Sequence, residues 1–301
     1  MTYAFSGNLK RSCDLMYPIK KIGVIGAGSM GQGIAQVCAQ GGYEVLLFDA
    51  DAKATERGIR NIGNNIDQAI AKGKSSEGKK WETLLRIKPS SLEEIKVDLV
   101  IEAVVEVLTV KQEIFSRLEG LNKGDTIFAT NTSSLSVTNI ASVLTRPERF
   151  IGLHFFNPAH LMKLIEVISG ERTDRELIAP MIEFVKTIEK IPVVVKDSPG
   201  FIVNRVARHY YLESLHLLEE NSSDIGTIDA LLRSAGFKLG PFELMDLIGN
   251  DVNLEVSKLM YKAFNNVPRL RPSWIQEEKV RAGQLGRKTG KGYYEYETAS
   301  Q

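Results

Sequence analysis

The chain has 301 residues, of which 43% are hydrophobic and 25% are charged. This composition is typical of a folded globular protein and excludes a disordered one. At about 150 residues per domain, the length predicts two domains. The 38 Lys and Arg residues are balanced by 37 Asp and Glu residues, and the net charge of +1 provides no overall field for binding nucleic acid or an anionic membrane. No apolar run is long enough to span a bilayer. From the balanced charge and the absence of such a run, we expect neither a nucleic-acid nor a membrane partner.

The first segment of the chain does not have the pattern of a targeting sequence. Residues 1–18 are polar and mixed, without the apolar core of a secretory signal, and one Arg beside one Asp does not fit a mitochondrial presequence. We expect residues 1–18 to form a flexible N-terminal arm. Two cysteines are too few for a disulfide framework, and Cys38, at helical spacing among apolar residues, is expected to be a buried thiol. A reducing compartment, the cytoplasm, is the expected location.

A glycine-rich segment follows the first apolar run of the chain. The run at 22–25 leads into GAGSMG at 26–31, and apolar residues then recur at helical intervals. This order of strand, turn and helix is typical of a dinucleotide site. Gly26 permits the tight turn, Gly28 lets a pyrophosphate approach the backbone, and Gly31 lets the helix pack against the strand. The helix N-terminus then favours the anion.

An acidic residue at the end of the next strand supports this interpretation. A GxGxxG pattern alone also occurs for structural reasons. Here the predicted strand at 43–48 ends at Asp49, 18 positions after Gly31 and close to the spacing of the acid that binds the cofactor ribose. Its carboxylate would accept hydrogen bonds from a ribose 2′-hydroxyl and repel a 2′-phosphate. The sequence therefore predicts NAD rather than NADP.

The next segment predicts a helical hairpin with a basic turn. The helical pattern over 56–85 is interrupted at 72–76, and Lys72 and its neighbours form a local positive cluster. A solvated hairpin is the ordinary interpretation of such a cluster. The alternative is that Lys72 contacts the phosphorylated tail of a substrate.

Two buried strands, at 97–105 and 126–130, are each followed by polar residues. Ligands collect at the carboxyl ends of strands in open α/β sheets, so both polar clusters are candidate site residues. Glu106 follows the first strand. After the second, we expect Ser134 to cap the following helix, and Ser133 to remain a candidate site residue.

A histidine and a glutamate occupy the next two predicted strands. The strands at 150–156 and 162–168 are joined by a short turn, and if they pair around it, His154 faces Glu166. A carboxylate that fixes the tautomer of a histidine and stabilises its imidazolium suits a general base. The pair is therefore a candidate for proton transfer.

The other three histidines are weaker candidates. His209 and His216 lie seven positions apart in a helical pattern and are expected to be structural. His160 lies in the turn, without an evident carboxylate partner. No metal site is expected.

Four motifs then occur in order along the chain: NTSS at 131–134, HFFNP at 154–158, MKLIEV at 162–167 and KDSPGFIVNR at 196–205. Together they resemble the 3-hydroxyacyl-CoA dehydrogenase family, especially its short 3-hydroxybutyryl-CoA dehydrogenase members, and the similarity extends from about residue 20 to residue 296. The resemblance implies an NAD-dependent (S)-3-hydroxyacyl-CoA dehydrogenase that works reversibly on an acyl-CoA substrate.

The resemblance also implies roles for individual residues. His154 matches the catalytic base and Glu166 its orienting acid. Ser133 and Asn204 match residues that hydrogen-bond the reacting oxygen of the substrate. The remaining matches are Asn157, which steadies the His154 region, and Glu106 and Lys111, which lie near the cofactor ribose and phosphates.

The expected fold is an α/β Rossmann-type domain with a mostly parallel sheet, followed by a smaller all-α domain. Ser198-Pro199-Gly200 marks the boundary, which gives an arm at 1–18, a nucleotide-binding domain with a helical-hairpin insertion at 19–198, and a helical substrate and dimerisation domain at 199–301. In the last of these, Ile202, Val203, Val206, Tyr210 and Leu217 mark one apolar side of a long helix, with further helices at 228–234 and 242–264. By analogy with the family, we expect a homodimer.

Three alternatives compete with this assignment. The segment GRKTGKG at 286–292 lacks the spacing of a phosphate-binding loop, which argues against a kinase or ATPase. A dehydrogenase of free β-hydroxyacids would use a catalytic lysine in place of the His154 and Glu166 pair. A non-catalytic protein, such as a relative of a lens crystallin or a cofactor-binding sensor, would need neither His154 nor Ser133.

Overall fold

The computed structural model describes residues 19–297 of the chain. The expected N-terminal arm and Cys13 lie outside the described residues. The chain divides into two compact units that meet between Asp197 and Ser198. None of the described helices combines the length and apolarity that crossing a membrane requires.

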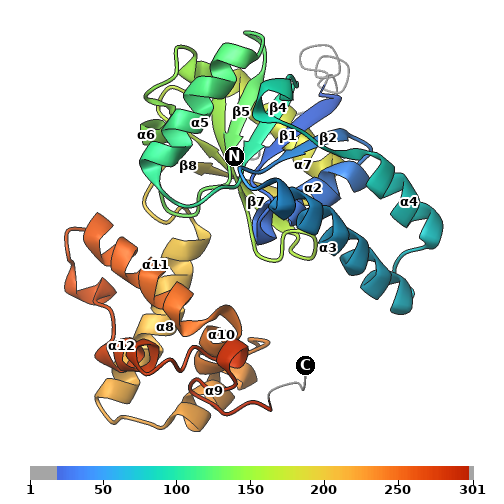
Figure 1. The fold of residues 1–301 in the computed structure, drawn as a ribbon. Helices are drawn as coiled ribbons and strands as arrows, with labels where there is room; N and C mark the ends of the chain where they lie inside the picture. The colour runs from blue at the N-terminus through green and yellow to red at the C-terminus, as the bar shows by residue number, and fades with distance from the viewer. Residues whose placement is uncertain (1–18, 298–301) are drawn as a thin grey trace, which may run out of the picture. The chain divides into compact units, whose positions relative to one another are not determined.

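The N-terminal unit is built on one sheet (Figure 1). Over the described residues the sheet has eight strands in the order β3-β2-β1-β4-β5-β6-β7-β8. All neighbouring strands pair in parallel except β6 and β7, which are antiparallel. The strands are β1 Lys21–Ile25, β2 Glu44–Phe48, β3 Ile87–Pro89, β4 Leu99–Glu102, β5 Ile127–Thr130, β6 Phe150–Phe155, β7 Leu164–Ser169 and β8 Ile191–Lys196. The mostly parallel sheet that the sequence predicts is confirmed.

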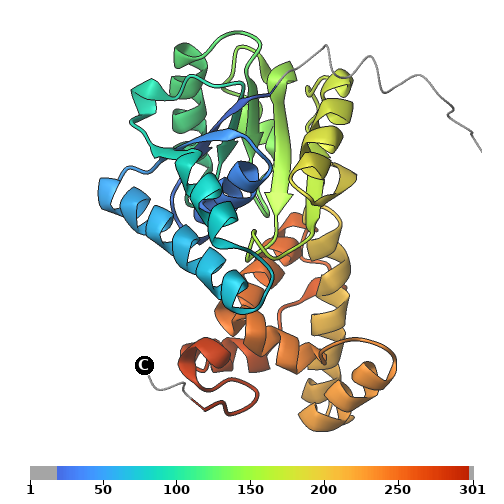
Figure 2. The same cartoon turned by 90° about the vertical axis from the view of Figure 1, so that its right-hand side faces the viewer.

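Helices cover both faces of this sheet. Side chains of α2, α3 and α7 pack into one core with the strands, whereas Phe115 of α5 packs edge-on against Phe128 and Phe150 on the other face. The predicted helical hairpin is present as α3 and α4, which lie alongside each other (Figure 2). The helices of this unit are α2 Ser29–Gln40, α3 Ala52–Ala71, α4 Glu77–Leu85, α5 Leu108–Leu121, α6 Val137–Ala141 and α7 Ile178–Thr187.

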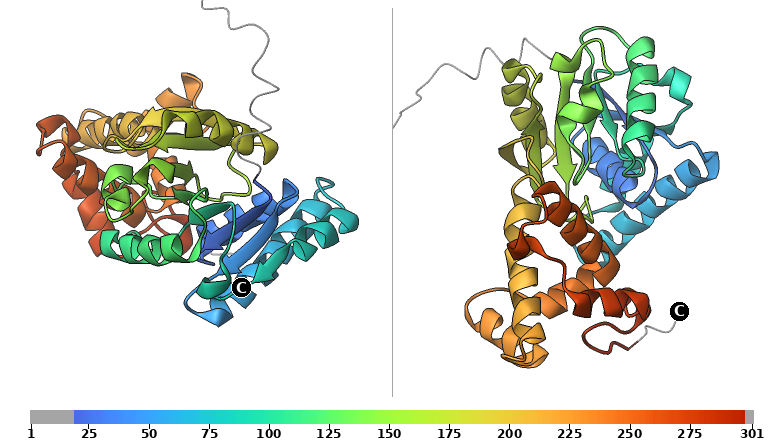
Figure 3. Two further views of the ribbon diagram at one scale, coloured as in Figure 1. Left: turned by 90° about the horizontal axis from the view of Figure 1, so that it is seen from above. Right: turned by 90° about the vertical axis from the view of Figure 1, so that its left-hand side faces the viewer.

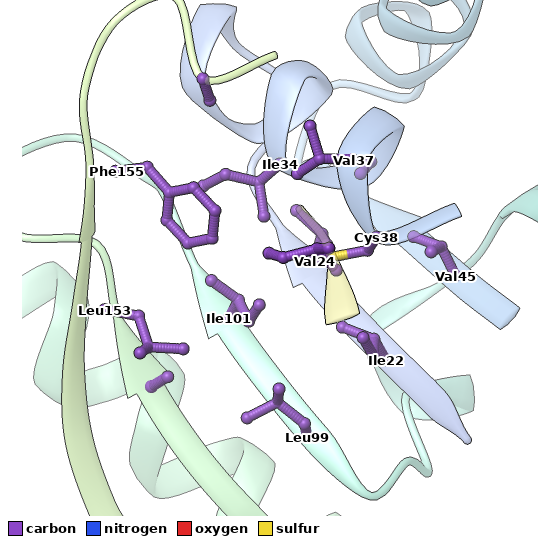
Figure 4. Close-up of a cluster of buried hydrophobic side chains, with 14 of the residues drawn as sticks. Ile22, Val24, Ile34, Val37, Cys38, Val45, Leu99, Ile101, Leu153 and Phe155 are labelled. Carbon is purple, nitrogen blue, oxygen red and sulfur yellow. The ribbon is translucent and has the colours of Figure 1, made fainter. Parts of the chain in front are cut away.

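The central core explains why the glycine-rich segment folds as it does. Branched residues from β1, β2 and β4 meet the apolar side of α2, whose Ile34 and Cys38 are fully buried (Figure 4). Burial raises the pKa of the Cys38 thiol far above its ordinary value, so it packs as a small apolar group. The buried thiol that the sequence predicts is confirmed.

The C-terminal unit is helical, as predicted (Figure 3). Its helices are α8 Val203–Glu219, α9 Ile225–Ser234, α10 Pro241–Ile248, α11 Asn250–Ala263 and α12 Trp274–Arg281. The single helical stretch expected over 242–264 is wrong: Gly249, with φ of +105°, ends α10 and precedes α11. A left-handed backbone angle of this kind interrupts a helix and favours glycine.

The long helix α8 packs on a different side from the one its apolar spacing suggested. Val206 is 67% exposed, whereas Tyr211, Leu212 and Leu215 are buried in the core of the unit. Arg208 is buried on the same side, where its guanidinium donates to the backbone oxygen of Asn253. Because polar residues share the buried side of α8, hydrophobic spacing alone could not identify it.

Candidate active site

The glycine-rich turn between β1 and α2 has the shape that a dinucleotide requires. Gly26 has φ of +103°. A Cβ on Gly31 would lie 1.7 Å from the carbonyl oxygen of Gly26, whereas a Cβ on Gly28 would meet nothing within 4 Å. Gly28 precedes α2 without a side-chain cap, so the N–H groups of the first turn are suited to a bound anion. The three glycines therefore fit a pyrophosphate at this position.

Asp49 lies beside this turn and lines a pocket of about 320 Å³ with Gly28 and Gln32. Its carboxylate accepts the N–H of Ala27 at 2.8 Å and the N–H of Asp51 at 3.0 Å. These bonds fix the acid at the end of β2, next to the glycine-rich turn. The position fits the ribose of a dinucleotide.

Two arginines share this pocket with Asp49. Arg57 and Arg60 of α3 both line it, and Arg57 pairs with Asp51 at 3.0 Å on the surface. Asp51 lies two positions after Asp49 and adds a second negative charge. In the structure its side chain also accepts the N–H of Lys53 and caps α3.

The register of the sheet brings the carboxyl ends of four strands to one edge. Ile25 pairs with Glu102, Glu102 with Thr130, and Thr130 with Gly152. His154 therefore lies two residues beyond this level on β6, at the edge where the glycine-rich turn begins. This is the edge at which open α/β sheets bind ligands.

A buried ion-pair network supports this edge. Lys111 is 1% exposed, and its ammonium lies 2.6 Å from Glu102 and 3.2 Å from Glu106. Burial raises the pKa of Glu102 against the opposing charge of Lys111. The Lys111 ammonium thus forms ion pairs with two carboxylates of the protein itself.

Glu106 organises the loop that follows β5. Its Oε1 accepts the hydroxyl of Thr132 at 2.6 Å, the N–H of Ser133 at 2.9 Å and the N–H of Ser134 at 3.1 Å. Burial alone would raise the pKa of Glu106, but the Lys111 charge and these hydrogen bonds lower it below its ordinary value. Ser133 is thus held in place by a charged carboxylate.

The expectation that Ser134 caps the following helix is wrong. Ser136 is the N-cap of α6, and its hydroxyl accepts the N–H of Asn139 at 3.1 Å. The reason lies in the network above: Glu106 draws the backbone of residues 132–134 toward itself, and the helix begins only after this loop.

The histidine and glutamate singled out in the sequence are in contact. His154 and Glu166 are register partners on β6 and β7, and His154 Nδ1 lies 2.7 Å from Glu166 Oε2. Their exposed fractions are 5% and 0%. The ring of Phe156 lies against the imidazole at 4.4 Å between centroids. The predicted pairing is confirmed, and it presents a histidine whose tautomer is set by a buried acid.

Neighbouring side chains fix the end of the His154 strand. Asn131 Oδ1 accepts the N–H of Phe155 at 2.8 Å, which ties the loop after β5 to β6. Asn157 Oδ1 accepts the hydroxyl of Ser29 at 3.4 Å, which links the turn after β6 to the start of α2. Asn131 belongs to a motif the sequence showed, but its partner is 24 positions away and could not be read from the motif.

The remaining predicted site residues lie apart from this group or in the other unit. Lys72 is exposed at the C-terminus of α3. Asn204 lies in the first turn of α8, within the C-terminal unit. His160 lines a pocket of about 490 Å³ with Asn157, and burial, followed by the charge of Lys190, lowers its pKa.

Two further polar residues lie near the site, although neither is a candidate from the sequence. Asp197 accepts the hydroxyl of Ser136 at 2.8 Å and the N–H of Thr138 at 2.8 Å, so it holds the start of α6. Lys190 is buried beneath the turn that follows His154. Such contacts between distant parts of the chain have no local sequence signal.

Comparisons with known proteins match both units to models of one family. Residues 21–198 match the model "3-hydroxyacyl-CoA dehydrogenase, NAD binding domain", and residues 200–296 match "3-hydroxyacyl-CoA dehydrogenase, C-terminal domain". The 3-hydroxyadipyl-CoA dehydrogenase of Escherichia coli is 44% identical over 94% of this chain and 60% of its own length. The 3-hydroxybutyryl-CoA dehydrogenase of Clostridioides difficile is 40% identical over 92% of this chain and 99% of its own length.

Solved structures give the same result. The (S)-3-hydroxybutyryl-CoA dehydrogenase of Ralstonia eutropha superposes with a TM-score of 0.88 at 39% identity, over 93% of this chain and 99% of that one. A 3-hydroxybutyryl-CoA dehydrogenase structure from Escherichia coli has a TM-score of 0.90 at 43% identity, over 94% of this chain and 61% of that one. The chain thus spans about three fifths of the length of the Escherichia coli relatives.

Proposed function

The chain belongs to the 3-hydroxyacyl-CoA dehydrogenase family, and we propose that it is an NAD-dependent (S)-3-hydroxyacyl-CoA dehydrogenase acting on short-chain substrates such as 3-hydroxybutyryl-CoA. The observation that carries this proposal is the 2.7 Å contact between His154 and Glu166, at the strand edge that also bears the glycine-rich turn. A free-acid dehydrogenase with a catalytic lysine is disfavoured, because the proton-transfer group at this edge is an imidazole.

His154 is the general base of the proposed reaction. The glycine-rich turn and Asp49 would hold NAD, which would supply the hydride acceptor for C3 of the substrate. His154 takes the proton from the C3 hydroxyl as that group becomes a carbonyl, and returns it in the reverse direction. Glu166 holds Nδ1, which leaves proton exchange to Nε2 and stabilises the imidazolium that forms.

Other residues bind and orient the substrate in this proposal. Ser133, held by Glu106, donates a hydrogen bond to the reacting oxygen, and Asn204 is assigned the same task from its family motif. Asn157 steadies the end of the His154 strand through its contact with Ser29. Glu106 and Lys111 lie near the cofactor in this proposal. Their role there is to support, through their charges, the loop that follows β5.

The acyl-CoA tail is assigned to the basic turn of the helical hairpin. Lys72 is exposed there, close to Lys74. Two adjacent cations favour a phosphate group by charge alone. A Lys72→Ala variant that keeps the wild-type KM for acetoacetyl-CoA would remove this residue from the substrate site.

A homodimer through the helical unit completes the proposal. Ile202, Val206 and Leu231 are exposed apolar side chains of this unit, and covering such side chains favours association. Equilibrium sedimentation at micromolar concentration is the test, and a single monomeric species would refute the dimer. The buried thiol of Cys38 supports the proposed cytoplasmic location, where thiols stay reduced.

The decisive experiment is oxidation of NADH in the presence of acetoacetyl-CoA. We expect turnover by the purified, folded chain and none with free acetoacetate. NADH binding without turnover would instead favour a non-catalytic cofactor-binding protein. Absence of both NADH binding and turnover would contradict the assignment of the glycine-rich turn as well.

A further inference from the structure

Lys190 has an unusual environment for a charged residue. It lies in the link between α7 and β8 and is 7% exposed. Its ammonium donates to the backbone oxygens of Ala159 at 2.8 Å and Met162 at 2.7 Å, and lies 3.4 Å from that of His160. Three carbonyl groups of one turn thus converge on one buried cation.

Burying the charge of Lys190 costs free energy of desolvation. No ion pair among the described residues includes Lys190. The desolvation of its charge is offset by the carbonyl dipoles of the turn, together with the charge of the neighbouring Glu189. Burial, followed by the charge of Lys163, lowers the pKa of Lys190 to about 8. The ammonium is therefore still the main form at neutral pH. An apolar side chain at this position would avoid the desolvation of a charge but would leave the carbonyls of the turn without this donor. The contribution of Lys190 therefore lies in the turn that it holds.

The turn in question joins the two strands that carry His154 and Glu166. Its amide groups at Leu161 and Met162 both donate to the backbone oxygen of Pro158, at 2.9 and 3.0 Å. The carbonyl groups of Ala159, His160 and Met162 instead face the Lys190 ammonium. Two N–H groups of the turn thus have a partner within the turn, whereas these carbonyl groups have the ammonium of Lys190 as their partner.

The turn also packs against α2. A Cβ on Gly33 would lie 3.0 Å from the Cβ of Ala159, so helix and turn are in close contact. The hydroxyl of Ser29, the first residue of α2, donates to Asn157 Oδ1. The turn is thus held both by the nucleotide-binding helix and by Lys190.

We propose that Lys190 is a positioning residue, which holds the turn at 157–163 so that the His154 strand keeps its place against the start of the nucleotide-binding helix. The expected kinetic effects of this proposal rest on the proposed function. Its expected structural effects rest on the geometry of the turn alone. Lys190 itself touches no reacting group. It acts through the turn on Asn157 and on the end of β6.

Three variants test this role. Lys190→Met keeps the volume of the side chain and removes every donor, Lys190→Arg keeps the charge and the donors, and Lys190→Gln keeps two donors without charge. Lys186→Met is the matched control, because Lys186 lies on nearby α7 and pairs with Glu183 at the surface. Each protein is assayed well below its unfolding temperature, with NADH and acetoacetyl-CoA.

We expect Lys190→Met to lower kcat about 10- to 100-fold and to change the KM for acetoacetyl-CoA less than about threefold, because the turn aligns reacting groups without binding the acyl chain. Lys190→Arg should restore most of the loss, and Lys186→Met should match the wild type. If Lys190→Met does not fold, Lys190→Gln takes its place. Wild-type kcat in any folded variant without the charge would overturn the proposal, as would an equal loss in Lys190→Arg.

A second readout does not depend on activity. Hydrogen exchange of the Leu161 and Met162 amides should be faster by at least about 10-fold in Lys190→Met than in Lys186→Met, because the turn opens locally without its anchor. Unchanged exchange would overturn the proposal even if the wild type proved active. Faster exchange in a protein without dehydrogenase activity would instead uphold the positioning role and refute the proposed function.

Discussion

His154 Nδ1 and Glu166 Oε2 lie 2.7 Å apart as register partners on two antiparallel strands. We expect His154→Ala to lower kcat by at least about 100-fold, the lower range for loss of a general base. Glu166→Gln should lower kcat by about 10-fold or more, because the amide no longer stabilises the imidazolium. Steady-state kinetics at saturating NADH measures both. His216→Ala, at a partly buried position of α8, is the control, and a similar loss there would count against a special role for His154.

The glycine-rich turn gives a pair of opposed predictions. Gly31→Ala places a methyl group against the Gly26 carbonyl, so we expect a loss in unfolding free energy of about 3 kcal/mol or more. Gly28→Ala meets no atom, so its stability should fall by less than about 1 kcal/mol, while its affinity for NADH falls because the methyl group occupies the approach of the pyrophosphate. Thermal unfolding and NADH fluorescence titration separate the two effects. Equal stability losses would contradict the geometry.

Asp49 is expected to select the cofactor. Asp49→Asn should weaken NADH binding by about 10-fold, the scale of one charged hydrogen bond, and narrow the difference between NADH and NADPH, since a 2′-phosphate would no longer meet a negative charge beside Arg57 and Arg60. The dissociation constants of both cofactors are the measurement. Glu44→Gln, at the other end of β2, provides the comparison. An unchanged ratio would show that selection lies elsewhere.

Glu106 predicts a stability difference that depends on pH. Its pKa is lowered in the folded protein, so its charge stabilises the fold above the ordinary pKa of 4.5, and this contribution disappears as the pH falls through the folded value. Glu106→Gln should therefore cost about 1 kcal/mol at pH 7, a modest figure because a third of the side chain faces solvent and screens the Lys111 pair. The cost should shrink toward pH 4. Urea unfolding across this range, with Glu183→Gln as the control, is the measurement, and a constant difference would exclude the charge as its source.

The sequence was most informative where its signals are local. Strand, turn and helix around Gly26 to Gly31 follow from residue spacing, because each glycine answers a constraint within a few positions. The His154 and Glu166 contact was also accessible, since two strands around a short turn have few possible registers. In both cases neighbouring residues determine the geometry.

What the sequence missed depends on distant contacts. The N-cap of α6 is Ser136 and not the expected Ser134, because Glu106, some 30 positions earlier, binds the intervening loop. The buried side of α8 includes Arg208, whose partners lie on α11. Lys190 resembles any surface lysine until the fold places three carbonyls around it. Side chains of this kind acquire their surroundings only after the chain has folded.

The reversal of direction between β6 and β7 gives the length of their connection a meaning beyond its composition. Successive side chains on a strand alternate between faces, so deleting a single residue between Phe156 and Lys163 would turn Glu166 to the opposite surface of the sheet while leaving every amino acid of the pair intact. The contact between His154 and Glu166 therefore depends on the number of residues in this connection. A deletion of one residue there would break the contact as surely as replacement of the histidine.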